Sequence, residues 1–268
     1  MTDHPFRSPP GAVRPDVLIC AGLDPSGGAG LIADVRVVSE LGGRPVGVVT
    51  ALTVQNTTAV INTEAMNASE IREQLEFLLS DVEVRAVKIG MIGSSEIAKA
   101  ISHALALTSA PVVWDPVIHP SRGDVPFIDS LFGHAVAALM PHVTVLTPNT
   151  QELAFLTGAA IESATDAASV GQELAGRLAT AVLVKGGHLG GDESIDFLCR
   201  ADGIEPLRGP RLPGGEYVHG TGCALSSALA VHLARGASLL DACRAAKDFV
   251  AARLAHPARP GRGGAAVV

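Results

Sequence analysis

Short apolar runs alternate with longer helical patterns along most of this 268-residue chain, and this alternation limits the possible folds more than any single motif does. The apolar runs are brief and rich in β-branched residues, which is typical of buried strands in a parallel sheet. They cover residues 17–21, 46–52, 84–89, 112–114, 143–146 and 181–184. This pattern predicts an α/β protein, in which helices cover both faces of a central, mostly parallel sheet.

The helical patterns carry start signals of their own. Asn67 precedes Glu70 by three residues and is predicted to cap the helix that follows. Ser94 or Ser95 is predicted to cap the next helix, which runs to about Leu107. Further helices are predicted over residues 31–41, 128–140, 151–157, 167–179, 224–234 and 239–254, and an antiparallel pair of strands over 194–207.

Charge and cysteine usage exclude several classes of protein. The net charge is −7, which argues against a nucleic-acid partner. The four cysteines show no metal-binding spacing and no paired framework, so a reduced, cytoplasmic setting is expected. No apolar run approaches the ~18 residues that a membrane span needs, and the first residues lack the apolar core of a secretory signal.

One domain is enough to account for the whole chain. We predict a single α/β domain over residues 15–255, because 268 residues are enough for one large domain and nothing in the chain demands two. Residues 1–14 carry several prolines and little apolar material, and residues 256–268 are rich in Gly, Pro and Arg. Both end segments are predicted to be flexible.

The segment His219–Cys223 places glycines, a hydroxyl and a thiol at the start of an apolar helical pattern. The first amides of a helix lack intrahelical acceptors and lie at the positive end of its dipole, so they can hold a phosphate. In that position Cys223 is predicted to have a pKa below its ordinary value and to accept a proton from a substrate hydroxyl. The alternative is that Cys223 is a small core side chain.

The other polar motifs follow the apolar runs, where ligands bind in sheets of this kind. Residues 24–30 follow the first run with three glycines and lead into a helix, which suits either backbone contact with a ligand or a plain tight turn. They do not form a Walker loop or a dinucleotide fingerprint, and so we discount a dehydrogenase. Lys185 ends the last apolar run, at the carboxyl end of a strand, and is the leading cation for a phosphate; the alternative is an ordinary surface lysine.

Seven ordered blocks resemble those of the hydroxymethylpyrimidine and phosphomethylpyrimidine kinases of thiamin biosynthesis, in the ribokinase-like superfamily. The blocks are residues 21–30, 50–57, 88–91, 115–117, 147–152, 184–188 and 219–223. The resemblance therefore covers most of the chain. It implies a ribokinase-like fold, a homodimer and a kinase that transfers the γ-phosphoryl group of ATP to 4-amino-5-hydroxymethyl-2-methylpyrimidine, and then to the resulting monophosphate.

The resemblance also implies residue roles. Asp34 and Gln55 would read the pyrimidine, and Gly22, Met91 and Val117 would line its pocket. Without the resemblance, Gln55 would be interpreted as an exposed loop amide and Asp34 as a solvated helix charge.

For the phosphates, the resemblance implies that Glu152 and Asp115 associate with Mg²⁺, which uses few carboxylates and keeps several waters. The residues implied to hold ATP or its γ-phosphate are Asn149, Lys185, Gly220, Thr221 and Gly222. The alternative for Glu152 is an ordinary acid in the first turn of a helix.

Two other functions stay open. A pyridoxal or pyridoxine kinase would use the same fold on a similar hydroxymethyl heterocycle, although Gln55 and Cys223 favour the pyrimidine. A catalytically silent binding protein is the second, and the presence of Lys185, Glu152 and Cys223 counts against it. The sequence around His119 departs from the family pattern, the tail resembles it only loosely, and neither His188 nor His219 is given a role.

Overall fold

The computed structural model describes residues 14–118, 132–187 and 189–267. The strands are β1 (Asp16–Leu23), β2 (Arg44–Gln55), β3 (Val60–Ala65), β4 (Ala86–Ile89), β5 (Val112–Trp114), β6 (Val145–Leu146), β7 (Ala181–Val184), β8 (Glu193–Arg200) and β9 (Gly203–Pro210). The helices are α1 (Gly30–Glu40), α2 (Ala68–Leu79), α3 (Ser95–Leu105), α4 (Phe132–Leu139), α5 (Thr150–Thr157), α6 (Ala164–Leu178), α7 (Thr221–Ala234) and α8 (Leu239–Leu254). Two short 3₁₀ turns cover Met140–His142 and Gly215–Tyr217.

The strands form one sheet in the order β3-β2-β1-β4-β5-β6-β7-β8-β9. The six central strands, from β2 to β7, run parallel to one another. The edge strand β3 and the final pair β8 and β9 are antiparallel to their neighbours. The predicted α/β fold with a mostly parallel sheet is confirmed.

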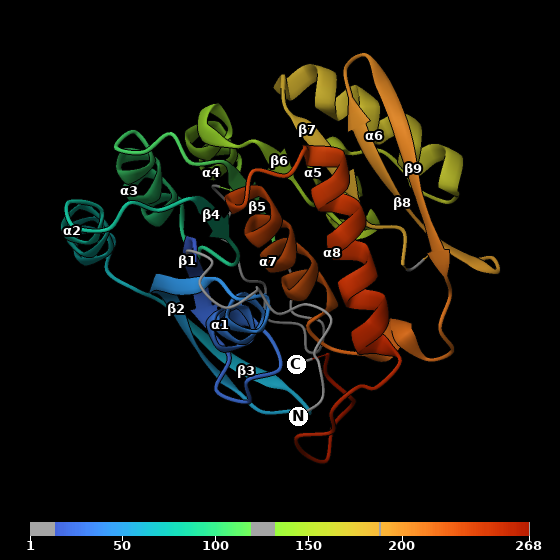
Figure 1. The fold of residues 1–268 in the computed structure, drawn as a ribbon, viewed down its shortest axis with the longest axis horizontal. Helices are drawn as coiled ribbons and strands as arrows, with labels where there is room; N and C mark the ends of the chain where they lie inside the picture. Colours follow the sequence, from blue (N-terminus) through green and yellow to red (C-terminus); the bar gives the residue numbers. More distant parts are fainter. Residues whose placement is uncertain (1–13, 119–131, 188, 268) are drawn as a thin grey trace.

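Helices cover both faces of the sheet (Figure 1). Apolar side chains from α2 to α6 pack on one face, in a core that includes Leu75, Ile101 and Trp114. The helices α1, α7 and α8 pack on the other face, around Leu229 and Phe249. Both cores consist mainly of aliphatic side chains, because the chain has few aromatic residues.

Most predicted elements are present. Strands β5 and β7 and helix α8 match their predicted bounds, and β8 and β9 form the predicted antiparallel pair. Asn67 accepts from the Ser69 amide at 2.9 Å, and Ser94 accepts from the Ile97 amide at 3.2 Å, so both predicted caps are confirmed. The first residues of the helix predicted over 128–140 lie outside the described residues, and the rest forms α4.

The edge strand β3 was not predicted. Only its first residue, Val60, is buried, and the remaining side chains are wholly or partly exposed. A strand with so little apolar alternation is hard to distinguish from a loop in the sequence. Its backbone pairs with β2, which extends the sheet at the edge nearest to Gln55.

The tail predicted to be flexible over residues 256–268 packs against the domain at its end, over residues 263–267. The His219 amide donates to Ala265 at 2.8 Å, and the Val267 amide donates back to His219 at 3.1 Å. Ala265, Ala266 and Val267 are buried, and the Gly263 amide donates to the Thr57 hydroxyl at 3.1 Å. The Gly- and Pro-rich tail therefore packs with its backbone close to His219 and Thr57. Apart from Arg14, the predicted N-terminal flexible segment lies outside the described residues.

Within the described ranges, no helix is both long enough and apolar enough to cross a membrane.

Candidate active site

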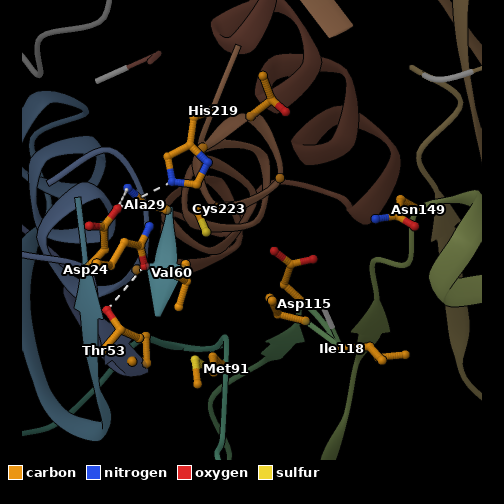
Figure 2. A pocket seen from close by; sticks show the side chains of 18 of the residues that line it. Asp24, Ala29, Thr53, Val60, Met91, Asp115, Ile118, Asn149, His219 and Cys223 are labelled. Carbon is orange, nitrogen blue, oxygen red and sulfur yellow. Dashed lines mark hydrogen bonds and ion pairs between the residues drawn. The ribbon is translucent and has the colours of Figure 1, made fainter. Parts of the chain in front are cut away.

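A cavity of about 410 Å³ opens beyond the carboxyl ends of β1, β2, β4 and β5. Every site residue predicted from the sequence lines it, with the exception of Asp34. The lining residues among these predictions are Gly22, Gln55, Met91, Asp115, Val117, Asn149, Glu152, Lys185, Gly220, Thr221, Gly222 and Cys223. Figure 2 shows Cys223, Asp115, Met91 and Val60 among the side chains around this cavity.

Two glycine loops meet at the mouth of the cavity. Gly220 has a φ of +84°, and a Cβ there would collide with the Gly28 carbonyl oxygen, so both the conformation and the contact require glycine. The His219 imidazole lies 3.4 Å from the Asp24 carboxylate (Figure 2). Burial disfavours the charged form of Asp24 and so tends to raise its pKa. Hydrogen bonds from His219 and Ser26 outweigh this effect and hold the pKa of Asp24 below its usual value. These contacts fix the start of α7 against the loop after β1.

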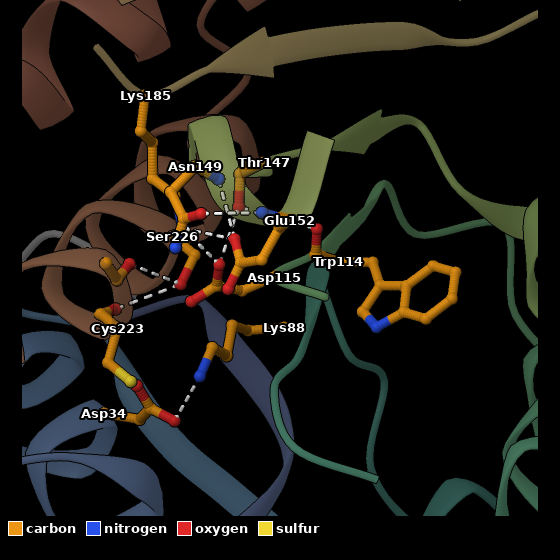
Figure 3. A network of polar contacts seen from close by, with 11 residues as sticks. Asp34, Lys88, Trp114, Asp115, Thr147, Asn149, Glu152, Lys185, Cys223 and Ser226 are labelled. Carbon is orange, nitrogen blue, oxygen red and sulfur yellow. Dashed lines mark hydrogen bonds and ion pairs between the residues drawn. The ribbon is translucent and has the colours of Figure 1, made fainter. Parts of the chain in front are cut away.

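A partly buried cation lies between two acids at the end of β7. Lys185 Nζ donates to Asp115 Oδ1 at 2.6 Å and lies 3.5 Å from Glu152 Oε2 (Figure 3). Burial disfavours the ammonium, but the two carboxylates outweigh this effect and raise the pKa of Lys185. A Cβ on Gly222 would lie 3.1 Å from Lys185 Nζ. Glycine at that position therefore lets the first turn of α7 approach the cation closely. We call this group, Asp115, Glu152, Lys185 and residues 220–223, the charged end of the cavity.

Asn149 and Glu152 close a capping box at the start of α5. The Asn149 side chain accepts from the Glu152 amide at 2.8 Å, and Glu152 Oε2 accepts from the Asn149 amide at 2.7 Å. The Glu152 side chain is thus fixed by its own helix as well as by Lys185. Burial raises the pKa of Glu152 to about 7, although the Lys185 ammonium opposes this rise. The alternative interpretation, a first-turn helix acid, describes the local structure of Glu152 without accounting for its contact with Lys185.

Cys223 is half-buried in the first turn of α7 and lines the cavity. The prediction of a lowered pKa is wrong. Burial raises the pKa of Cys223 to about 11, even though the Lys88 ammonium lowers it. The helix start alone does not offset the loss of hydration around a sulfur anion.

Asp34 is not at the cavity surface. Its carboxylate is fully buried under α7, where Oδ2 accepts from Lys88 Nζ at 2.5 Å and Oδ1 accepts from the Ser227 hydroxyl at 2.8 Å. The interpretation of Asp34 as a pyrimidine-reading residue is corrected on this ground, because both oxygens are engaged inside the protein. Lys88, which no sequence argument assigned to the site, does line the cavity.

The opposite end of the cavity is largely apolar. Val60, Met91 and Val117 pack together there with Ala51, and we call these four side chains the apolar end. A Cβ on Gly22 would lie 2.8 Å from Met91 Sδ, so the glycine leaves room for the methionine. Gln55 lies at the rim, where its Oε1 accepts from the Thr53 hydroxyl at 3.2 Å.

A second cavity of about 140 Å³ lies beside the first, and both are lined by Lys185, Gly187, Thr221 and Gly222. Leu212, Leu225, Val250 and Leu254 give the second cavity an apolar wall. At its border, Lys247 Nζ donates to Asp196 Oδ2 at 2.8 Å, which connects α8 to β8. Sequence reasoning missed these residues, because they come from three elements and a loop and form no motif. His119 and His188 lie outside the described residues.

The charged end offers too few protein ligands to hold Mg²⁺ alone, but it suits an Mg²⁺ ion that also binds phosphate oxygens. In the described part of the chain, no three His, Cys, Asp or Glu side chains converge as a metal cluster. Asp115 and Glu152 supply two carboxylates at the cavity wall, both in contact with Lys185. Two carboxylates fit a magnesium ion whose remaining ligands are waters and phosphates.

Two cavities that meet at one cation and one helix start have the geometry that a small-molecule phosphotransferase needs to bring two substrates together. The family model described as phosphomethylpyrimidine kinase matches residues 24–268. The chain belongs to this family.

The relatives of known name include kinases of this family and a structurally similar pyridoxal kinase. The hydroxymethylpyrimidine/phosphomethylpyrimidine kinase of Streptomyces coelicolor is 39% identical over 241 residues, which cover 90% of this chain and 89% of that protein. The crystal structure of phosphomethylpyrimidine kinase from Clostridium difficile has a TM-score of 0.74 at 33% identity, and the match covers 90% of this chain and 99% of that one. An ADP complex of Bacillus subtilis pyridoxal kinase has a TM-score of 0.84 at 26% identity, and covers 95% of this chain and 96% of that one.

Proposed function

We propose that this kinase transfers the γ-phosphoryl group of ATP to the hydroxymethyl oxygen of 4-amino-5-hydroxymethyl-2-methylpyrimidine, and then a second phosphoryl group to the monophosphate. The observation that carries the proposal is the position of Lys185, Thr221 and Gly222, which line both cavities. Phosphoryl transfer needs the two substrates to meet at such a shared, positively charged point. The names of the relatives support the choice of substrate.

In this proposal the larger cavity holds the pyrimidine. Met91 and Val117 contact the ring faces and its methyl group, and the Gln55 amide hydrogen-bonds the ring nitrogen and amino edge. The smaller cavity holds the adenosine part of ATP against Leu225, Val250 and Leu254. The hydroxymethyl group then points at the charged end.

The transfer itself is a displacement at phosphorus. The hydroxymethyl oxygen forms a bond to the γ-phosphorus, the bond from that phosphorus to the bridging oxygen breaks, and ADP leaves. Lys185 and the amides at the start of α7 bind the oxygens that gain charge. Mg²⁺ held near Asp115 and Glu152 would neutralise phosphate charge when bound. Asn149 keeps Glu152 in place through the capping box.

The proton of the hydroxyl goes to the Cys223 sulfur in the first transfer, when that sulfur is deprotonated. The second transfer differs, because its nucleophile is a phosphate oxygen. The second pKa of a phosphate monoester is about 6, so at neutral pH this oxygen already carries the charge that the attack requires. We therefore assign the base role of Cys223 to the first transfer alone.

Pyridoxal is the second candidate substrate. Its support is the structural likeness to the pyridoxal kinase of Bacillus subtilis, which is higher in TM-score than the likeness to the phosphomethylpyrimidine kinase. We also propose a homodimer, which the exposed apolar side chains of Leu52, Val54 and Ile61 on β2 and β3 support. Sedimentation equilibrium measures the assembly directly.

The test is a product assay with purified protein, ATP and Mg²⁺, supplied in parallel with the hydroxymethylpyrimidine and with pyridoxal. Mass spectrometry of the products should show first one and then two phosphates on the pyrimidine. Phosphorylation of pyridoxal alone would replace the proposal by the second candidate. ADP release with neither substrate phosphorylated would contradict both.

A further inference from the structure

A buried ion pair lies directly beneath the cavity and has no part in the transfer described so far. Lys88 on β4 and Asp34 on α1 are both fully buried, with 2.5 Å between Nζ and Oδ2. The Ser227 hydroxyl on α7 donates to the other carboxylate oxygen at 2.8 Å. The three side chains thus connect the sheet to two helices at one point. Figure 3 shows Asp34 and Lys88 facing each other.

Such a pair is costly as a purely structural device. Both charges lose their hydration, and well-packed apolar side chains of similar volume often serve a core as well or better. The surrounding core on this face of the sheet is apolar, with Val37, Ala224 and Ala228 among its members. The pair therefore calls for an explanation in terms of what lies next to it.

The neighbour is Cys223. It precedes Ser227 by four residues in α7, so the thiol and the hydroxyl lie one turn apart on the same face of the helix. Figure 3 shows the Cys223 sulfur directed toward the Asp34 and Lys88 side chains. Lys88 and Cys223 both line the cavity, although Asp34 and Ser227 do not.

Charges on four elements act on the sulfur. The Lys88 ammonium on β4 lowers the pKa of Cys223, whereas Asp34 on α1 and Asp115 after β5 raise it. Lys185, at the end of β7, also interacts with Cys223, but its ammonium is engaged by Asp115 and Glu152. Burial disfavours the Lys88 ammonium, yet Asp34, Cys223 and Asp115 together raise the pKa of Lys88, so its charge persists at neutral pH.

We propose that Lys88 is a positioning residue for Cys223, whose buried ammonium, held by Asp34, stabilises the negative charge that the sulfur carries after losing its proton. Asp34 limits how far Lys88 lowers the pKa of Cys223, because the negative carboxylate offsets part of the positive potential that Lys88 produces at the sulfur. Ser227 fixes the carboxylate and so fixes the ammonium. The inference deepens the proposed function, since it rests on the base role of Cys223, but it does not depend on which heterocycle is phosphorylated.

The two members of the pair make opposite predictions for one measurable quantity. Lys88→Met removes the stabilising charge and should raise the apparent pKa of the Cys223 thiol by about one unit or more. Asp34→Asn leaves the ammonium unneutralised and should lower that apparent pKa by a similar amount. The rate of alkylation of Cys223 by iodoacetamide, followed from pH 7 to pH 11 by peptide mass spectrometry, reports this pKa, because only the thiolate attacks the reagent carbon and displaces iodide.

The full-length protein without substrates is used, so the alkylation result is independent of kinase activity. Cys20, Cys199 and Cys243 are buried and serve as internal controls for local unfolding. If Lys88→Met does not fold, Asp34→Asn alone still tests the direction. Opposite shifts in the two variants, with the three control cysteines unreactive, support the proposal. Shifts in the same direction, or no shift in a folded variant, overturn it.

Together with the product assay, the alkylation experiment distinguishes failure of the Lys88 role from failure of the proposed function. If the wild-type protein phosphorylates no heterocycle while the variants shift the thiol in opposite directions, the proposed function fails and the electrostatic pairing stands. If the protein is active and the thiol does not respond to either variant, the pairing fails and the proposed function stands. In an active enzyme, the rate of the first transfer should rise with pH as the thiolate forms. Asp34→Asn should move this rise to lower pH.

Discussion

The charged end and the apolar end of the cavity are built by different physical means. In the charged end, polar contacts fix the charged side chains: Lys185 donates to Asp115 at 2.6 Å, and Glu152 accepts from the amide of Asn149 at 2.7 Å. The apolar end has van der Waals packing among Val60 on the edge strand β3, Met91 after β4 and Val117 after β5. Val117 is only partly buried.

The difference follows from what each end binds. A transferring phosphoryl group gains charge on fixed oxygens, so its partners must be oriented before the reaction begins. A flat heterocycle needs a surface of the right shape and one or two hydrogen bonds. We therefore expect changes at the charged end to lower kcat strongly, and changes at the apolar end to affect KM moderately.

The largest effect is expected for Lys185→Gln. Removing a positive group that stabilises transition-state charge costs about 10²- to 10³-fold in kcat. Binding of the pyrimidine, measured by calorimetry in the absence of ATP, should remain close to that of the unmodified protein, because the apolar end is intact. A fall in pyrimidine affinity as large as the fall in kcat would contradict the proposal that the charged end acts on catalysis and the apolar end on pyrimidine binding.

Cys223→Ala comes next, and the two transfers provide its control. The first transfer should slow by about 10²-fold, the low end for loss of a general base, whereas the second should change much less. Single-turnover assays started from the hydroxymethylpyrimidine and from its monophosphate separate the two steps. Equal losses in both steps would show that Cys223 acts on phosphate binding and not on the hydroxyl proton.

The pH dependence of the two transfers sharpens the same point. Since burial raises the pKa of Cys223 to about 11, the thiol is protonated at neutral pH. The rate of the first transfer should therefore rise with pH, as the thiolate fraction rises, from pH 7 toward that pKa. The second transfer should vary little over this range. A first transfer that is flat between pH 7 and pH 9.5 would contradict the base role.

A moderate effect is expected for Gln55→Ala. Loss of one hydrogen bond to the heterocycle costs about 1 kcal/mol, or close to a fivefold rise in KM for the pyrimidine, and kcat should stay near its original value. Gln55→Glu keeps the side-chain length and is the matched variant. An unchanged KM in the alanine variant would remove Gln55 from the site.

The smallest effect is expected at the contact between the tail and the β2–β3 hairpin. Thr57→Val removes the hydroxyl that accepts from the Gly263 amide at 3.1 Å. The expected loss is about 1 kcal/mol of stability, equivalent to a fall of about 2 °C in Tm for a domain of this size. Calorimetry of the free protein measures it. An unchanged Tm would mean that water replaces the hydroxyl at no cost.

The charged end was largely predictable from the sequence because its residues stand in motifs directly after strands. Lys185 follows the apolar run 181–184, and Asp115 follows 112–114, so the parallel sheet brings them to one edge. The site residues that were missed or misplaced depend on packing between distant elements. Asp34 and Lys88 are 54 residues apart, and neither the helical pattern around Asp34 nor the strand around Lys88 indicates that the two side chains form a pair.

The pKa of Cys223 illustrates a second limit. The sequence correctly places the thiol in the first turn of a helix, and the helix dipole favours the thiolate. How much hydration the sulfur loses depends on the packing of α1 and β4 beneath it, which the local sequence does not specify. The edge strand β3 and the docked tail escaped prediction for a related reason, because backbone pairing with distant segments stabilises them.

The meeting of the loops at Gly28 and Gly220 has a consequence for how the enzyme comes into being. Every strand of the described sheet is complete by Pro210, whereas His219 and Ser227 contact partners 195 and 193 residues earlier in the chain. A nascent chain that has left the ribosome only as far as β9 therefore holds the whole sheet but no catalytic centre. Because contacts between such distant segments form slowly, activity should lag behind the appearance of secondary structure when the protein is synthesised or refolded.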